Sequence, residues 1–545
     1  MKVTTMLSSS SFLLLILLIS ANPYARALQG GNGIEEELED VKRSDFPTGF
    51  LFGVATSSYQ IEGAILEDGK SLSNWDVFVH KNGNVNNGDT GDIATDHYHR
   101  YLEDIETIHS LGVDAYRFSI SWSRILPNGK LGGVNAAGIM FYNSIIDNLL
   151  LRGIQPFVTI HHWDIPQVLS DEYGGWLNPL IQDDFVHFAE TCFKNFGDRV
   201  RYWVTINEPN IAADFAYERG KHPPGHCSPP FGNCSAGNSD TEPLIAMHNM
   251  LLAHAKASKL YREQFQASKI LRGVIGIVVH AIMYEPFTDD EHDKEAVKRA
   301  LANNVAWAFD PLVFGDYPPE MRRYHGNELP KFTPEERLLI RDSIDFLGLN
   351  HYATLYAKDC IRSSCVSSNS ACAPGGDRAI RGFVCTTAER GGVLIGEPTG
   401  LPTFSVVPRG MEEIVDYVKN RYHNKPMLIT ENGYSTPPQQ EQVDDFQLDV
   451  KRIAFHKAYL AFLARAMRNG ADVRGYFVWT LMDDFEWSLG YDVKFGLYSV
   501  DRATLNRTPR SSAKWYRNFL GNISSSSMKP RTAVAFWSKV GRAEE

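Results

Sequence analysis

The sequence has no excess of positive charge. Its 54 lysine and arginine residues are outnumbered by 65 aspartate and glutamate residues, so the formal net charge is −11 at pH 7. No basic stripe interrupts this acidic balance, and we therefore expect no nucleic-acid partner.

Long apolar runs are missing beyond the N-terminal region, so no membrane partner is expected. Near the N-terminus, Lys2 precedes an almost continuous apolar run over Phe12–Ile19, and Ala25-Arg26-Ala27 offers a small-x-small cleavage site. This pattern predicts a secretory signal peptide over residues 1–27. A membrane anchor is the alternative, but the run is too short to span a bilayer.

The chain also lacks a CxxC pair and any histidine spacing typical of zinc ligation, so no metal site is expected. The seven cysteines are Cys192, Cys227, Cys234, Cys360, Cys365, Cys372 and Cys385. A secreted chain favours disulfides, and Cys227 and Cys234 bracket a short loop that predicts one. The last four permit three pairings, among which Cys360–Cys365 with Cys372–Cys385 is our first expectation. Cys192 lies in an apolar helical pattern and is expected to be a buried free thiol.

Internal repeats are absent, and eight short apolar runs alternate with amphipathic helical stretches such as Tyr98–Leu111, Ala137–Arg152 and Asp449–Asn469. Continuously apolar runs are typical of parallel strands that are covered on both faces. The series predicts an α/β fold, a single (β/α)8 TIM barrel with long βα loops. A doubly wound sheet is the alternative, but it requires a glycine-rich phosphate loop after the first strand, and Gln60–Gly63 is not one. The eight runs are Phe50–Ser57, Ala115–Trp122, Pro156–Trp163, Tyr202–Asn207, Val274–His280, Phe346–Tyr352, Met427–Thr430 and Gly475–Leu481.

The domain organisation follows from these elements. We expect a signal peptide over residues 1–27, an N-terminal extension over 28–45, one catalytic domain over 46–520 and a C-terminal tail over 521–545. The connections Asn210–Arg272 and Lys358–Lys425 are unusually long, and we interpret them as walls of a substrate pocket. Asn233, Asn506 and Asn522 each begin an acceptor sequon, which predicts glycosylated surface loops.

Two glutamates stand at strand ends, where the catalytic groups of a barrel gather. Glu208 follows Thr205-Ile206-Asn207, and Glu431 follows Met427–Thr430. Paired carboxyls suit glycosidic cleavage, because one donates a proton to the leaving oxygen while the other attacks the anomeric carbon or activates water. A structural salt bridge is the alternative for either glutamate alone. A metal site at His161-His162 is a weaker alternative, because no third ligand follows at a suitable spacing.

Four long motifs carry a resemblance to glycoside hydrolase family 1, and specifically to its plant β-glucosidases. The similarity extends from about Phe46 to about Phe519, nearly the whole mature chain. Through the predicted signal peptide, we expect secretion to the cell wall or delivery to the vacuole. The motifs are Ser58–Gly63, Thr205–Pro209, Ile429–Gly433 and Trp479–Trp487.

The resemblance implies a role for each residue of the catalytic centre. Glu208 is the expected general acid/base and Glu431 the expected nucleophile, ionised in the resting enzyme. Arg117 is expected to keep Glu431 charged, and Tyr352 to donate a hydrogen bond to it. Asn207 is expected to bind the sugar 2-hydroxyl.

The resemblance also implies a glucose site. Glu486 is expected to bind two sugar hydroxyls, which favours an unphosphorylated glucose, galactose or fucose, and Trp479 is expected to stack under the ring. The residues expected around the sugar are Gln60, His162, Asn207, Tyr352, Trp479, Glu486, Trp487 and Phe495.

The aglycone side departs from the family pattern. Many plant members place a tryptophan where this chain has Thr403, so Phe404 is expected to replace that platform only in part. Ile211 and Phe215 are further expected wall residues. The short Cys360–Cys365 loop resembles plant members that act on coniferin and syringin.

The sequence therefore predicts an enzyme without a cofactor, a retaining β-glucosidase whose partner is a small β-glucoside. An acid at Glu208, in place of the glutamine of thioglucosidases, favours O-linked substrates with an aryl or phenylpropanoid aglycone. A transglucosidase on the same scaffold is the first alternative. A non-catalytic sugar-binding protein is a more distant one, because it would be expected to lack one of the two carboxyls.

Overall fold

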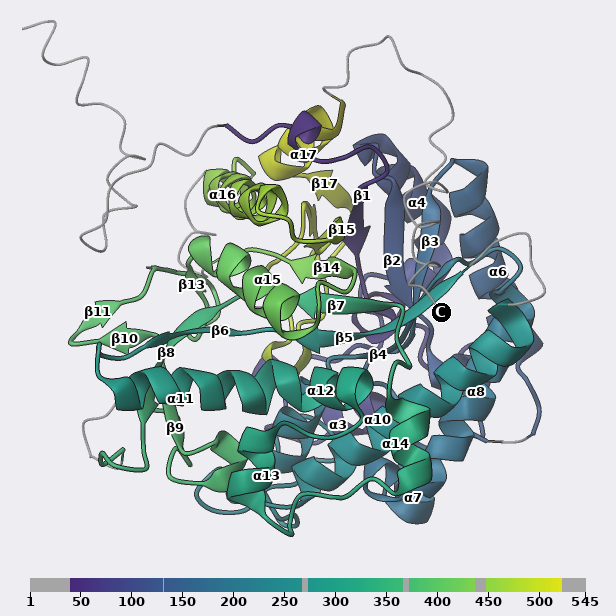
Figure 1. Cartoon of the computed structure of the whole chain (residues 1–545). Coiled ribbons are helices and arrows are strands. Elements are labelled where there is room, and N and C mark those ends of the chain that lie inside the picture. Colours follow the sequence, from purple (N-terminus) through teal and green to yellow (C-terminus); the bar gives the residue numbers. More distant parts are fainter. Residues whose placement is uncertain (1–39, 131, 267–272, 366–371, 437–446, 522–545) are drawn as a thin grey trace, which may run out of the picture.

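Eight parallel strands close into a barrel in the computed structural model, which describes residues 40–130, 132–266, 273–365, 372–436 and 447–521. Their order around the barrel is β1-β15-β14-β7-β5-β4-β3-β2, and helices surround them (Figure 1). The predicted (β/α)8 architecture is confirmed. The barrel strands are β1 (Leu51–Ala55), β2 (Ala115–Ser119), β3 (Gln155–His161), β4 (Tyr202–Asn207), β5 (Val274–His280), β7 (Phe346–Asn350), β14 (Met427–Asn432) and β15 (Val473–Trp479).

Each predicted run overlaps one barrel strand, although five runs extend past the strand's end by two or three residues. The strand after Met427 is longer than predicted, because it continues through Glu431 and Asn432. The barrel strands consist almost entirely of buried residues, as expected where side chains on one face fill the barrel and those on the other contact helices. Gly53 permits one tight contact, because a Cβ there would lie 2.3 Å from the Phe477 ring.

The helices follow the strands in alternation and cover the outside of the barrel (Figure 1). The longer helices are α4 (His97–Leu111), α6 (Ala136–Leu151), α8 (Leu180–Phe196), α10 (Glu242–Leu260), α11 (Glu291–Leu301), α12 (Trp307–Phe314), α15 (Arg409–Arg421), α16 (Val450–Arg468) and α17 (Ser511–Gly521). The shorter helices are α2 (Ser58–Ile61), α3 (Asn74–Val79), α5 (Trp122–Ile125), α7 (Gln167–Tyr173), α9 (Pro209–Ala213), α13 (Pro319–His325) and α14 (Pro334–Ile340).

The two long connections are not loops throughout, because α10 lies in the first and α15 in the second. The irregular parts that remain are shorter, and the second contains small antiparallel ladders beside the barrel (Figure 1). The strands outside the barrel are β6 (Met283–Pro286), β8 (Thr354–Asp359), β9 (Val384–Thr387), β10 (Glu389–Arg390), β11 (Val393–Leu394), β12 (Glu397–Pro398), β13 (Ser405–Val406), β16 (Tyr498–Val500) and β17 (Arg507–Pro509).

Three disulfides fasten these connections. They join Cys227 to Cys234, Cys360 to Cys365 and Cys372 to Cys385. Cys192 is a buried free thiol whose pKa burial raises well above its usual value.

The termini lie mostly outside the described residues, including the predicted signal peptide, nearly all of the tail and Asn522. Asn233 and Asn506 are exposed, as a glycosylated residue requires. Arg43 is buried and donates to the Phe50 carbonyl at 3.2 Å, so packing against the barrel begins before Phe46. Within the described residues, no helix combines the length and apolarity needed to cross a membrane.

Candidate active site

The two strand-end glutamates meet at one cavity of about 980 Å³. Glu208 directly follows β4, caps α9 and has a left-handed backbone with φ of 46°. Glu431 is the penultimate residue of β14. The ladders beside both glutamates shift register, between Val204 and Asn207 and between Ile429 and Glu431. Such irregularities are common beside active sites, where they redirect a side chain.

Glu431 accepts two hydrogen bonds that favour its ionised form. Arg117 Nη1 lies 2.5 Å from Oε1, and the Tyr352 hydroxyl donates to Oε2 at 2.7 Å. Burial nevertheless raises the pKa of Glu431 to about 7, with Arg117 acting against the rise and Glu208 adding to it. This differs from the expectation of a fully ionised resting carboxylate. Sequence reasoning weighed Arg117 but neither the burial nor the repulsion from a second buried carboxyl.

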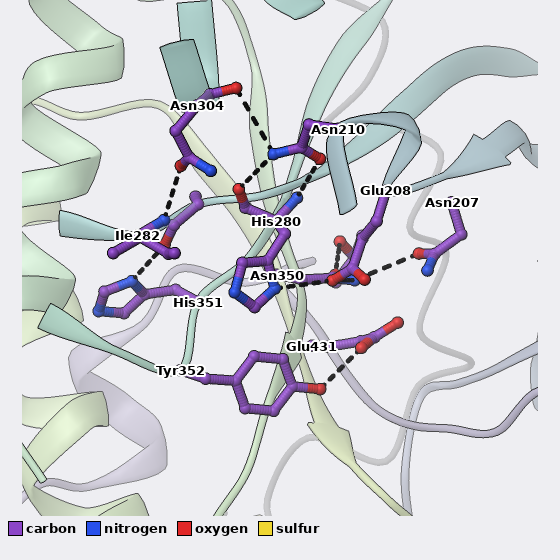
Figure 2. Close-up of polar contacts among 12 residues, drawn as sticks. Asn207, Glu208, Asn210, His280, Ile282, Asn304, Asn350, His351, Tyr352 and Glu431 are labelled. Atoms are coloured by element: carbon purple, nitrogen blue, oxygen red, sulfur yellow. Dashed lines mark hydrogen bonds and ion pairs between the residues drawn. The ribbon is translucent and has the colours of Figure 1, made fainter. Parts of the chain in front are cut away.

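Glu208 has different partners. Its Oε1 accepts from Asn350 Nδ2 at 2.8 Å and lies 3.1 Å from His280 Nδ1 (Figure 2). Its Oε2 makes no hydrogen bond within the described part of the chain, and Glu208 lines the cavity. One carboxyl therefore contacts a cation, while the other has an oxygen available to a ligand.

A polar network links the two glutamates from behind. Arg117 Nη2 donates to Asn207 Oδ1 at 2.6 Å, and Asn350 Nδ2 lies 3.2 Å from the same oxygen. The Asn207 amide nitrogen lies 3.2 Å from His162 Nε2. Arg117 and Asn207 are buried, and their partners hold each amide and guanidinium plane in place.

The expected glucose residues form one wall of the cavity. His162, Trp479, Glu486, Trp487 and Phe495 line it, together with Tyr352. Burial raises the pKa of Glu486 to about 8, with repulsion from Glu431 and Glu208 adding to the rise. The His162 ring stacks on Trp479 with centroids 5.9 Å apart. Burial lowers the pKa of His162 well below its usual value, so this imidazole is neutral.

Two expected sugar ligands are not among the cavity-lining residues, namely Gln60 and Asn207. Gln60 is fully buried, and its Nε2 donates to the Phe485 carbonyl at 3.0 Å and to Glu486 at 3.5 Å. The amides of Gln60 and Asn207 therefore contact side chains that line the cavity, namely Glu486 and His162.

The expected aglycone residues Ile211, Phe215, Thr403 and Phe404 all line the cavity. The Phe404 ring is nearly parallel to Tyr352, with centroids 5.5 Å apart, whereas Thr403 is exposed. Phe404 thus supplies an aromatic surface beside Thr403, the position at which the resemblance led us to expect a tryptophan.

Sequence reasoning missed several lining or supporting residues. His280 ends β5 and Asn350 ends β7, so the rule that locates Glu431, a polar residue at a barrel strand's carboxyl end, would have found both. A cluster of three charged residues also lines the cavity, and no strand-end position in the sequence indicates it. There Arg381 contacts Asp214 at 3.0 Å and Glu218 at 2.7 Å, and burial raises the pKa of Glu218 to about 8.

The side chains that could ligate a metal do not cluster within the described residues. Across the described ranges, no cluster of three or more histidine, cysteine, aspartate or glutamate side chains could hold a metal ion. His161, the neighbour of His162, is buried and its pKa is lowered by burial to about 3.

A closed (β/α)8 barrel with two buried carboxyls that line one cavity, one of them paired with an arginine, is typical of a barrel glycosidase. The comparison with known families agrees, since the model described as "Glycosyl hydrolase family 1" matches residues 42–524. The chain belongs to glycosyl hydrolase family 1 and is a glycoside hydrolase.

Its relatives include plant proteins. A rice (Oryza sativa subsp. japonica) protein called "Probable inactive beta-glucosidase 14" is 53% identical, covering 88% of this chain and 92% of that protein. A "Coniferin beta-glucosidase" of Pinus contorta is 48% identical, covering 92% of this chain and 97% of that protein. Among solved structures, a rice Os3BGlu6 β-glucosidase superposes with a TM-score of 0.83 at 42% identity, covering 88% of this chain and 99% of that one.

Proposed function

We propose that this protein is a retaining β-glucosidase that hydrolyses O-linked β-D-glucosides with an aryl or phenylpropanoid aglycone. The observation that carries the proposal is the difference between the two carboxyls. Glu431 accepts from Arg117 and Tyr352, which suits a nucleophile. Glu208 lines the cavity and has one oxygen without a hydrogen bond among the described residues, which suits a proton donor.

The reaction proceeds in two displacements. Glu208 transfers its proton to the glycosidic oxygen while a carboxylate oxygen of Glu431 attacks the anomeric carbon, so the C–O bond to the aglycone breaks and a glucosyl ester forms. Glu208, now a carboxylate, takes a proton from water, and the resulting attack on the anomeric carbon releases β-glucose and restores Glu431. A mutant of the rice Os3BGlu6 enzyme is described as holding Glc in a covalent complex, which supports such an ester here.

The sugar hydroxyls are assigned to Glu486, His162 and the amides behind them. A protonated Glu486 both donates and accepts, since its pKa is raised to about 8. Trp479 supplies the apolar face under the ring, and Asn207 is assigned to the 2-hydroxyl.

A non-catalytic role is the second candidate, because one relative is named as probably inactive. Both carboxyls and both partners of Glu431 are in place in this chain, which favours activity. The Pinus contorta relative is named for coniferin, and Phe404 offers an aromatic surface for such a ring. Secretion to the cell wall or vacuole stays a prediction from residues 1–27.

The nucleophile is tested with Glu431→Gly, which is expected to abolish turnover. Added azide is expected to restore activity by attacking the anomeric carbon in place of Glu431, and the product is then a glucosyl azide with inverted configuration. Glu62 offers a matched control, because it is equally buried and also accepts from an arginine and a tyrosine, Arg124 at 2.9 Å and Tyr142 at 2.6 Å. Glu62→Gly is expected to show no azide response. Ordinary turnover in Glu431→Gly would refute the assignment.

The aglycone is tested separately on the wild-type enzyme. A panel of monolignol, flavonoid and cyanogenic glucosides is expected to rank coniferin or syringin among the fastest. A ranking with both among the slowest would refute the aglycone proposal and leave the β-glucosidase proposal standing. Added acceptor alcohols show whether glucose passes to water or to an acceptor, which separates hydrolase from transglucosidase.

A further inference from the structure

His280 is a buried histidine that contacts Glu208 and has no role in the mechanism above. It is the last residue of β5, between β4 and β7 in the barrel, and is 7% exposed. Its Nδ1 lies 3.1 Å from Glu208 Oε1 (Figure 2).

The backbone of His280 is tied to the segment that carries Glu208. Asn210, two residues after Glu208, donates from Nδ2 to the His280 carbonyl at 2.9 Å and accepts from the His280 amide at 3.3 Å. Figure 2 shows this pair of bonds between Asn210, in α9, and the backbone of His280. The His280 ring is also nearly parallel to Tyr352 and Phe404, with centroids 5.8 and 6.1 Å away. The imidazole therefore has a fixed position relative to Glu208.

The direction of the hydrogen bond follows from Asn350. Thr430 Oγ1 donates to Asn350 Oδ1 at 2.7 Å, so the other amide atom is the nitrogen, and it donates to Glu208 Oε1 at 2.8 Å. An ionised carboxyl only accepts hydrogen bonds, and in a protonated carboxyl the oxygen that faces an N–H donor is the one that favours being without the proton. The second contact to that oxygen is then a donation from His280 Nδ1–H.

We propose that His280 is a positioning residue for the acid/base step, whose Nδ1–H holds Glu208 Oε1 so that the transferable proton resides on Oε2, on the cavity side. Two donors occupy Oε1, and Oε2 is the oxygen without a hydrogen bond in the described part of the chain. The inference rests on the proposed function, because His280 acts only through Glu208.

Three substitutions separate the donor from the rest of the ring. His280→Asn keeps an N–H at the position of Nδ1, because the first side-chain atoms of the two residues correspond. His280→Gln places its amide at the position of Nε2 and lacks the Nδ1 donor. His280→Leu removes both nitrogens.

The readout is kcat/KM for two glucosides with different leaving groups. A 2,4-dinitrophenyl group leaves without protonation, whereas an alkyl alcohol requires the proton of Glu208. His280→Gln and His280→Leu are expected to lower kcat/KM for an alkyl glucoside by roughly 10–100-fold, as a misplaced catalytic group does. The loss for the dinitrophenyl glucoside is expected to be much smaller, and His280→Asn is expected to recover most of the loss. Thermal unfolding shows that each variant is folded.

The outcomes distinguish the two proposals. Wild-type enzyme that releases no dinitrophenolate from the β-glucoside would refute the proposed function itself. If the wild type is active but the Gln and Leu variants lose equal factors on both substrates, or lose nothing, the role of His280 is refuted. The same holds if His280→Asn is no better than His280→Leu.

Discussion

Replacing Arg117 by glutamine is expected to move the acidic limb of the pH profile of kcat/KM to higher pH. Arg117 contacts Glu431 at 2.5 Å inside a buried site and favours its ionised form. Burial and the nearby Glu208 oppose ionisation, so the pKa of Glu431 is already about 7. Without the guanidinium nothing of comparable strength acts against that rise.

The size of the effect follows from the contact distance. An opposite charge this close lowers a carboxyl pKa by about 1–3 units, so its loss raises the pKa of Glu431 by a similar amount. The pKa of Glu431 is raised in the folded site. The ionised form, which attacks the anomeric carbon, predominates only above that pKa. At pH 6 roughly a tenth of wild-type Glu431 is ionised for a pKa of about 7. The expected rise lowers that fraction, and with it kcat/KM, by about 10–1,000-fold at pH 6 and progressively less as the pH increases.

The assay is kcat/KM for an aryl β-glucoside from pH 4 to 10 at constant ionic strength. Arg124→Gln is the matched control, because Arg124 is a buried arginine that contacts a buried glutamate, Glu62, at 2.9 Å outside the main cavity. Both variants lose a buried ion pair and are expected to be destabilised by about 3–5 kcal/mol. Only the change at Arg117 is expected to move the acidic limb.

Two results would refute this reasoning. An acidic limb that stays in place in Arg117→Gln would show that Arg117 does not control the ionisation of Glu431. An equal displacement in Arg124→Gln would show that loss of stability, rather than loss of the local charge, causes the change. Arg117→Lys, which keeps the charge but loses the fork that also holds Asn207, is expected to give an intermediate displacement.

Two further predictions concern charge and stability. Burial raises the pKa of Glu486 to about 8, so this carboxyl is mostly protonated over the acidic limb and repels Glu431 little there. Glu486→Gln, which is also neutral, is therefore expected to leave the acidic limb in place while KM rises; a limb displaced as far as in Arg117→Gln would contradict this reasoning. Cys227→Ser opens a disulfide that closes a seven-residue separation, which is expected to cost about 2–3 kcal/mol and to speed proteolysis of that loop. Unchanged proteolysis, compared with Cys192→Ser as a control, would show that the loop needs no disulfide.

Some of this fold is visible in the sequence because it depends on local pattern. Each run of buried-type residues contains a strand, since strands covered on both faces need apolar side chains at every position. Strand boundaries were less accurate. The predicted run ends at Trp122, but in the structure β2 ends at Ser119 and α5 begins at Trp122. Both elements are apolar, so the composition does not show where the strand ends and the helix begins.

The site was predictable to a similar depth. Glu208 and Glu431 stand beside runs that read as strands, so their positions at the barrel mouth follow from the chain order and the parallel topology. The pKa of Glu431 did not follow, because it depends on burial and on Glu208, which lies more than 200 positions away in the sequence. The direct sugar contact of Gln60 stays a prediction, and the structure adds that its side chain donates to the Phe485 carbonyl and to Glu486.

The sequence by itself determined the family, the barrel and the strand-end positions of the two glutamates, because continuous apolar runs and strand-end motifs are local properties of the chain. Only the tertiary structure decided what surrounds those glutamates. Arg117 and Tyr352 reach Glu431 from β2 and from the residues after β7, and His280 reaches Glu208 from β5. Closure of the barrel brings these strand ends together, and the resulting burial and charge contacts set the ionisation that the chemistry requires.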